Sequence, residues 1–168
     1  KDRIKMFVQM IMAKSLKERK KILEKLQKLQ KSDFIGILKA MEGYKVTIRL
    51  LDPPLHEFLP DPYDEQKNKN KKNKQLLERA RELAEINPMM GHRGVRVAIT
   101  HPEIYRMQIK AVFEATAYLA KSKVDARPQI MIPQVGSVEE LNHIKNIYKD
   151  VKDEMTEPHT NGAMAASP

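Results

Sequence analysis

The amino-acid sequence predicts an α/β fold built on a parallel sheet, and three observations lead to this prediction. Short apolar segments alternate with longer amphipathic ones in the order strand, helix, strand, helix, strand, helix, which is typical of βαβ units. Two of the amphipathic segments begin with the Ser-x-x-Glu spacing of a capping box. The run at 130–133, Ile-Met-Ile-Pro, is apolar throughout, as expected for a strand that a parallel sheet buries on both faces.

The chain is predicted to begin with helices. Apolar residues at helical spacing predict a core-facing helix over 3–12. Ser15, followed by Glu18, begins a second helix that is expected to run to residue 30. Residues 33–43 predict a third, short helix, because Ser and Asp at its start can cap it and a glycine at its end can stop it.

A strand predicted over 45–51 follows at once and carries Arg49 within a β-branched run. Two interpretations of this arginine are open. A buried cation in a strand is costly without a partner, so the strand could deliver Arg49 to an anion. Alternatively, alternation along an edge strand places Thr47 and Arg49 on a solvated face, which requires no function. Two prolines directly after Asp52 must end the strand.

The second half of the chain continues the alternation. The Asn-Pro pair at 87–88 ends a helix predicted over 75–86, because the residue before a proline is disfavoured in the helical region. Beyond it we expect a strand over 95–100, a helix over 103–121, the strand over 130–133, and a helix over 137–155 with a capping box of Ser137 and Glu140.

Length and composition indicate one domain or a piece of one. The 168 residues fall short of the roughly 200 to 250 of a usual α/β barrel. We expect this domain over 1–155, with a Lys/Asn-rich loop at 66–75 and a disordered tail at 156–168. These residues include no cysteine and no apolar run of 18, so thiolate sites and a membrane span are excluded and a cytoplasmic protein is expected.

The net charge of +9 raises the question of nucleic-acid binding. Five of the lysines lie in the 66–75 loop without interleaved aromatic residues, which is typical of a solvated insertion. Nucleic acid is therefore not expected as a partner. The alternative to an enzymatic role is a non-catalytic basic module that binds nucleic acid or recruits a partner chain.

Candidate binding residues collect where the predicted strands end. Arg49 and Asp52 close the first strand, and 133–136 closes the third. A Gly-His-Arg-Gly turn at 91–94 holds Arg93, but it enters a predicted strand and would lie at the opposite edge unless the chain returns it. Two converging arginine forks would suit a phosphate or carboxylate. The histidines have no ligand spacing, so no metal site is expected from them.

Four segments carry a family resemblance. Residues 47–60 read Thr-Ile-Arg-Leu-Leu-Asp-Pro-Pro-Leu-His-Glu-Phe-Leu-Pro, and 87–96, 101–105 and 130–133 follow in order. Together they resemble the pyruvate, phosphate dikinases of the phosphoenolpyruvate (PEP)-utilising enzymes. The string Leu-Asp-Pro-Pro-Leu-His-Glu-Phe is close to diagnostic, because the related PEP synthases and phosphotransferase-system Enzyme I share the barrel but lack the string.

The resemblance implies a partial (β/α)8 TIM barrel, with about three strands and their flanking helices, which this chain alone does not close. It implies that Arg49 and Arg93 bind the phosphate or carboxylate of PEP or pyruvate. The family interconverts ATP, pyruvate and phosphate with AMP, PEP and diphosphate through a phosphohistidine on a separate domain, with Mg²⁺ in the barrel, and is expected to form homodimers.

The resemblance also implies what to expect outside these residues. The magnesium ligands, a further substrate arginine and the cysteine proton donor of the family have no counterpart in this sequence. No catalytic or metal-ligating residue is therefore expected within it, and the chain alone is expected to be inactive. Two departures from the family pattern are Gln134, where leucine is usual, and the Lys/Asn-rich loop.

Overall fold

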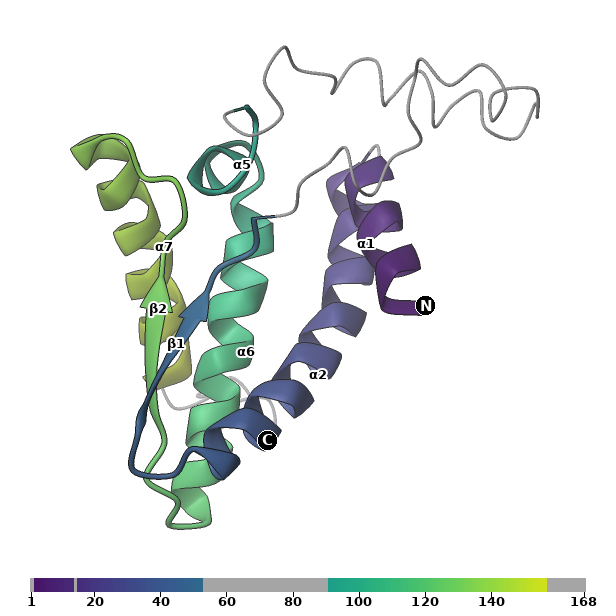
Figure 1. The fold of residues 1–168 in the computed structure, drawn as a ribbon. Coiled ribbons are helices and arrows are strands. Elements are labelled where there is room, and N and C mark those ends of the chain that lie inside the picture. Colours follow the sequence, from purple (N-terminus) through teal and green to yellow (C-terminus); the bar gives the residue numbers. More distant parts are fainter. Residues whose placement is uncertain (1, 14, 53–90, 157–168) are drawn as a thin grey trace, which may run out of the picture.

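The computed structural model describes residues 2–13, 15–52 and 91–156. The Lys/Asn-rich loop, the helix predicted over 75–86 and the tail after Thr156 lie outside the described residues. The elements follow in the order α1 (Asp2–Met12), α2 (Leu16–Ala40), β1 (Lys45–Arg49), α5 (Val95–Thr100), α6 (Pro102–Lys121), β2 (Arg127–Met131) and α7 (Val138–Thr156), as Figure 1 shows.

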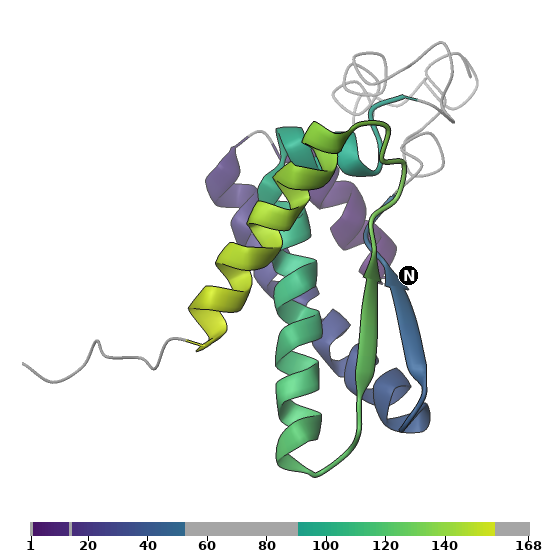
Figure 2. The ribbon, with the colours of Figure 1, turned by 90° about the vertical axis from the view of Figure 1, so that its left-hand side faces the viewer.

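The two strands pair in parallel, from Lys45 opposite Arg127 to Arg49 opposite Met131. Both run toward the end of the molecule where α5 lies (Figure 1), and α6 and α7 lie on the same side of the sheet (Figure 2). The parallel α/β prediction is thereby confirmed. A parallel pair needs a crossover connection, and α5 and α6 form the described part of it.

Helix α6 is the centre of the core. It packs against α2 on one side and α7 on the other (Figure 1). Each fully buried aliphatic side chain on this helix contributes about 1.5 to 3 kcal/mol through the hydrophobic effect. The fully or nearly fully buried residues of α6 are Ile104, Tyr105, Met107, Gln108, Ile109, Ala111, Val112, Ala115 and Leu119.

Both predicted serine caps are present, and the one at Ser137 forms a complete capping box. The Ser15 hydroxyl accepts a hydrogen bond from the Glu18 amide at 3.2 Å, which satisfies one of the free N–H groups at the start of α2. At the start of α7, Ser137 and Glu140 form hydrogen bonds with each other in both directions. Glu140 N–H donates to Ser137 Oγ and Ser137 N–H donates to Glu140 Oε2, each at 3.2 Å.

Helix α2 corrects the predicted break near residue 32. The structure has one helix of 25 residues where separate helices over 15–30 and 33–43 were expected. Asp33 does not cap a new helix, because its carboxylate binds Arg3 of α1 at 2.5 and 3.0 Å. The apolar face also continues without a break, so that Leu38 packs with Leu119 of α6.

The segment 95–100 is the main error of the sequence prediction, since it forms helix α5 and not a strand. A six-residue apolar run is ambiguous by periodicity alone. Here tertiary contacts decide, because Val95 and Ala98, three residues apart on one helical face, are both fully buried and α5 packs on α6 and α7.

Strand β2 also differs from the prediction, at 127–131 where 130–133 was expected. Its side chains alternate between exposed and partly buried, so the strand is not buried on both faces. The described residues therefore form two strands instead of three. The α/β class is confirmed, whereas the partial TIM barrel stays a prediction.

Candidate anion-binding site

Arg49, the last residue of β1, lies on the exposed face of the sheet. Ile48 beside it is buried, whereas Thr47 and Arg49 are exposed, and the Arg49 side chain is 56% accessible. On the same face, Thr47 Oγ1 donates a hydrogen bond to Gln129 Oε1 of β2 at 3.4 Å. The alternation predicted for an edge strand is therefore confirmed, and a ligand can reach Arg49 without entering the core.

Asp52 connects the two arginines that the sequence singled out. Arg93 donates to its carboxylate twice, from Nε to Oδ1 at 2.8 Å and from Nη2 to Oδ2 at 2.9 Å. The pair is well shielded, with 3% of the Asp52 side chain and 11% of the Arg93 side chain exposed. Arg49 Nη2 lies 3.7 Å from the same Oδ2. The structure thus brings Arg49 and Arg93 to one carboxylate at the end of β1.

The helical state of α5 explains how Arg93 reaches this place. A turn that led into a strand would lie at the other edge of the sheet, which was the objection raised by the sequence. The 91–94 turn instead leads into a helix, so it can lie at the carboxyl end of β1. Within the turn, Gly91 C=O accepts from Arg93 N–H at 2.9 Å and from Arg96 Nη1 at 3.1 Å.

The third predicted segment, 133–136, also meets the site. Val95 N–H donates to Pro133 C=O at 3.1 Å. Gly94 has a φ of +58°, and a Cβ there would lie 3.0 Å from the Pro133 oxygen and 3.1 Å from Gln134 Cβ. Only glycine fits this conformation and this close approach without strain. All three segments expected to form the site therefore converge.

Two site residues on α6 were missed by the sequence prediction. Tyr105 donates its phenolic O–H to Leu51 C=O at 3.0 Å. Gln108 accepts the Leu51 N–H on Oε1 at 2.7 Å and donates from Nε2 to Arg49 C=O at 3.4 Å. One signal was available, because a buried amide on an otherwise apolar helix face needs hydrogen-bond partners.

The charge around Asp52 acts on Tyr105. Burial raises the pKa of the Tyr105 phenol well above its ordinary value of 10.0, and the negative charge of Asp52 raises it further. The positive charge of Arg49 lowers it, with a smaller effect. The phenol is therefore neutral at physiological pH and keeps its proton for Leu51.

The described residues do not form a metal centre. Among residues 2–13, 15–52 and 91–156, no group of three or more His, Asp or Glu side chains is placed to hold an ion. His92 and His101 have ring centroids 6.3 Å apart, but His92 Nε2 is hydrogen-bonded to Thr100 Oγ1 at 2.7 Å. The resemblance implies a magnesium ion whose ligands are expected outside this sequence, and that expectation stays a prediction.

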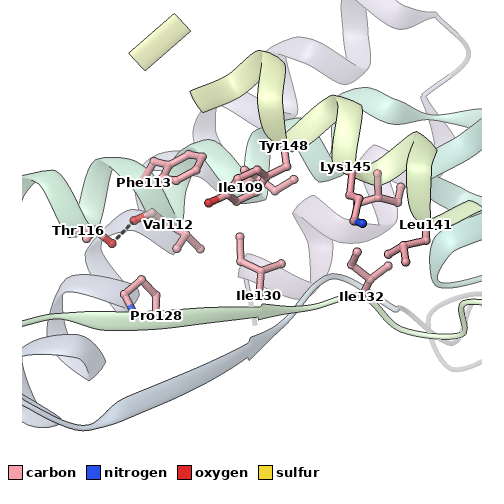
Figure 3. Close-up of a pocket in the computed structure, with 11 residues that line it drawn as sticks. Ile109, Val112, Phe113, Thr116, Pro128, Ile130, Ile132, Leu141, Lys145 and Tyr148 are labelled. Atoms are coloured by element: carbon pink, nitrogen blue, oxygen red, sulfur yellow. Dashed lines mark hydrogen bonds between the residues drawn. The ribbon is translucent and has the colours of Figure 1, made fainter. Parts of the chain in front are cut away.

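An apolar cavity of about 320 Å³ lies between α6, α7 and β2 (Figure 3). It opens on the helix-facing side of β2, opposite the face that carries Arg49. Lys145 is the one charged side chain in its lining, so the cavity lacks the paired cations expected of a site for a doubly charged anion. Its apolar lining includes Ile109, Phe113, Ile130, Ile132, Leu141 and Tyr148.

Similar proteins identify the family. Residues 5–166 match the family described as PEP-utilising enzyme, PEP-binding domain. The chain is 46% identical over 166 residues to a pyruvate, phosphate dikinase of Entamoeba histolytica, and the alignment covers 92% of this chain and 19% of the relative. It is 48% identical over 153 residues to that of Treponema pallidum, with 85% and 17% covered.

A plant relative with a similar match is also a pyruvate, phosphate dikinase. Pyruvate, phosphate dikinase 1, chloroplastic, of Oryza sativa subsp. japonica is 42% identical over 160 residues, covering 92% of this chain and 17% of the relative. The chain thus spans less than a fifth of the length of these relatives. Among the helices of the described residues, none has both the length and the apolar character of a membrane span. The chain belongs to the PEP-utilising enzymes, within their PEP-binding domain.

Proposed function

We propose that this chain supplies the substrate-anion-binding arginines of a pyruvate, phosphate dikinase. In this proposal Arg49 and Arg93 hold the phosphate or carboxylate of PEP or pyruvate. The observation that carries the proposal is the shared carboxylate of Asp52, which holds Arg93 by two hydrogen bonds and lies 3.7 Å from exposed Arg49. Two guanidinium groups and one carboxylate leave a net positive charge to meet an anion.

The two arginines contribute in different ways. Arg49 is the more exposed, so its planar fork of donors can contact the ligand directly. Arg93 already directs two donors to Asp52, which fixes its charge at the end of β1. A fixed positive charge beside a binding anion needs no reorganisation when the anion arrives, and such preorganised charge is effective in stabilising bound anions.

The reaction of the whole protein would be the interconversion of ATP, pyruvate and phosphate with AMP, PEP and diphosphate. It would need a phosphohistidine domain and a magnesium ion, whose ligands we place outside the described residues. A bound divalent ion would act there as a Lewis acid on the substrate oxygens. Because Arg49 and Arg93 can orient an anion but cannot transfer a proton, we expect the 168-residue chain alone to be inactive.

Titration calorimetry with PEP tests the anion-binding role. Arg49→Ala should weaken PEP binding about 10- to 100-fold, since a hydrogen bond to a charged group contributes about 1.5 to 3 kcal/mol. Arg127→Ala is the matched control, because Arg127 is an exposed arginine at the other end of the sheet and pairs with Asp125 at 2.6 Å. Equal affinity for PEP in Arg49→Ala and the unmodified chain would contradict the proposal.

The expected inactivity has its own measurement. Pyruvate formation from PEP, AMP and diphosphate is followed with the purified 168-residue chain in the presence of Mg²⁺. Turnover that persists after further purification would show that the chain contains a complete reaction centre.

A further inference from the structure

We propose that Tyr105 and Gln108 are positioning residues of the anion site, which fix the backbone of 49–51 and thereby the side chains of Arg49 and Asp52. The inference rests on the proposed function, because it assigns these residues a role in the geometry of that site. Neither side chain needs to touch the ligand. Both act from α6, which has more buried residues than any other helix of the described chain.

The backbone after β1 needs such support. Beyond the paired residues, one more hydrogen bond joins this segment to β2: Leu50 N–H donates to Met131 C=O at 2.9 Å. One residue later the chain has left the sheet, and Leu51 would keep an N–H and a C=O without strand partners. Backbone groups that are shielded from water must find other partners. Gln108 takes the N–H and Tyr105 takes the C=O.

The spacing of the two residues suits this task. Positions 105 and 108 are three apart, so both side chains project from one face of α6. Tyr105 is fully buried and 4% of Gln108 is exposed, and each must therefore direct its polar atoms at a fixed partner. The Gln108 amide offers one acceptor and one donor, as a peptide group of a neighbouring strand would, and it contacts the residues on both sides of Leu50.

Fixing Leu51 also fixes the charges of the site. Asp52 is the next residue, and its carboxylate receives both hydrogen bonds from Arg93. Arg49 precedes the fixed segment and has its own C=O held at 3.4 Å by Gln108. A shift of this backbone would therefore move Arg49, Asp52 and Arg93 together. Sub-ångström misplacement of binding groups is enough to weaken a site.

The test compares three variants of the 168-residue chain with one matched control. Gln108→Leu removes both side-chain hydrogen bonds, and Tyr105→Phe removes only the O–H. Gln108→Glu retains an acceptor for Leu51 N–H but loses the donor to Arg49 C=O and adds a negative charge, so it separates the two hydrogen bonds of Gln108. Gln27→Leu is the control. Gln27 Nε2 also donates a hydrogen bond to α6, to Glu114 at 2.9 Å, but Gln27 and Glu114 are both remote in sequence from the 49–52 segment.

Two readouts are taken under conditions in which every variant is folded. The first is measured by NMR and has two parts: the hydrogen-exchange rate of the Leu51 amide, and the signal of the Arg93 Nε–H group that donates to Asp52. We expect Leu51 exchange to accelerate at least 10-fold in Gln108→Leu, with a shifted or broadened Arg93 signal, and to accelerate less in Gln108→Glu, which keeps the acceptor for Leu51 N–H. Tyr105→Phe should perturb the Arg93 signal less. The second readout is the Kd for PEP, expected to rise about 10-fold in Gln108→Leu.

The outcomes separate this inference from the proposed function. If the unmodified chain does not bind PEP, the proposed function fails, while the Leu51 and Arg93 signals still decide whether the segment is held as described. If Gln108→Leu changes both signals no more than Gln27→Leu does, the positioning role is overturned. It is also overturned if the signals change and the PEP affinity of a binding-competent chain does not.

Discussion

Replacing Asp52 by asparagine removes the charge that joins Arg49 and Arg93 and leaves the size of the side chain almost unchanged. At 2.8 Å and an effective dielectric constant of about 20, one full charge pair attracts by about 6 kcal/mol. Desolvation of the two groups offsets much of this attraction. Removing one partner of such a shielded pair, however, leaves the other uncompensated, which costs about 3 to 5 kcal/mol.

We therefore expect Asp52→Asn to lower the free energy of unfolding by about 3 kcal/mol, taking the lower end because 11% of Arg93 is exposed. For a chain of this length the loss corresponds to a fall in Tm of about 6 to 12 °C. Urea unfolding followed by far-UV circular dichroism measures it, since the strongly helical elements give a large signal and the sequence has no tryptophan.

Asp33→Asn is the matched control for this experiment. Asp33 also pairs with an arginine, Arg3, at 2.5 Å, but 57% of Arg3 and 39% of Asp33 are exposed. A pair in that setting contributes no more than about 1 kcal/mol. If the two substitutions destabilise the chain equally, the reasoning that burial makes the Asp52 pair dominant is wrong.

Two further predictions concern neighbouring residues. Because the pKa of Tyr105 is raised in the folded chain, the stability that its neutral form supplies is complete below pH 10 and is lost as pH rises above 10.0. Between pH 9.5 and 11, the free energy of unfolding measured in urea should therefore fall more steeply with pH in the unmodified chain than in Tyr105→Phe, by up to about 1.4 kcal/mol per pH unit. Equal slopes for the two chains would contradict this prediction. Gly94→Ala should destabilise the chain by about 1 to 3 kcal/mol in thermal unfolding, because Gly94 has a φ of +58° and an added Cβ would lie 3.0 Å from the Pro133 oxygen. The control is Gly36→Ala within α2, where an added Cβ would meet no atom within 4 Å. This substitution should be neutral or stabilising.

The elements that the sequence predicts correctly are those with local signals. Caps at Ser15 and Ser137, and the proline at the start of α6, are read from spacings of one to four residues, and the helices there begin where expected. The alternation of elements correctly predicted a parallel sheet, although one of its three predicted strands is helix α5. The rule that ligand sites collect where parallel strands end predicted that 49–52 and 133–136 would meet, but it argued against the 91–94 turn, for which only the family resemblance implied a place in the site.

The errors arise where distant contacts decide. The segment 95–100 carries a β-branched pattern, but Val95 and Ala98 are buried by α6 and α7, which no local pattern reveals. Asp33 has the side chain of a helix cap, but in the fold its carboxylate accepts hydrogen bonds from Arg3 of another helix. The partnership of Gln108 with Leu51 joins residues 57 apart, so its existence depends on the complete fold.

The pairing of β1 with β2 has a consequence for how the chain folds. Partner residues in the two strands are 82 positions apart, so the whole crossover must be in place before β1 finds its neighbour. Closing a loop of that length costs about 4 kcal/mol of chain entropy beyond a constant, and doubling it would add only about 0.6 kcal/mol. During synthesis the helices before β1 can form early, whereas the sheet must wait for the last third of these residues. Insertions between Asp52 and Gly91 should slow this step more than they weaken the finished fold.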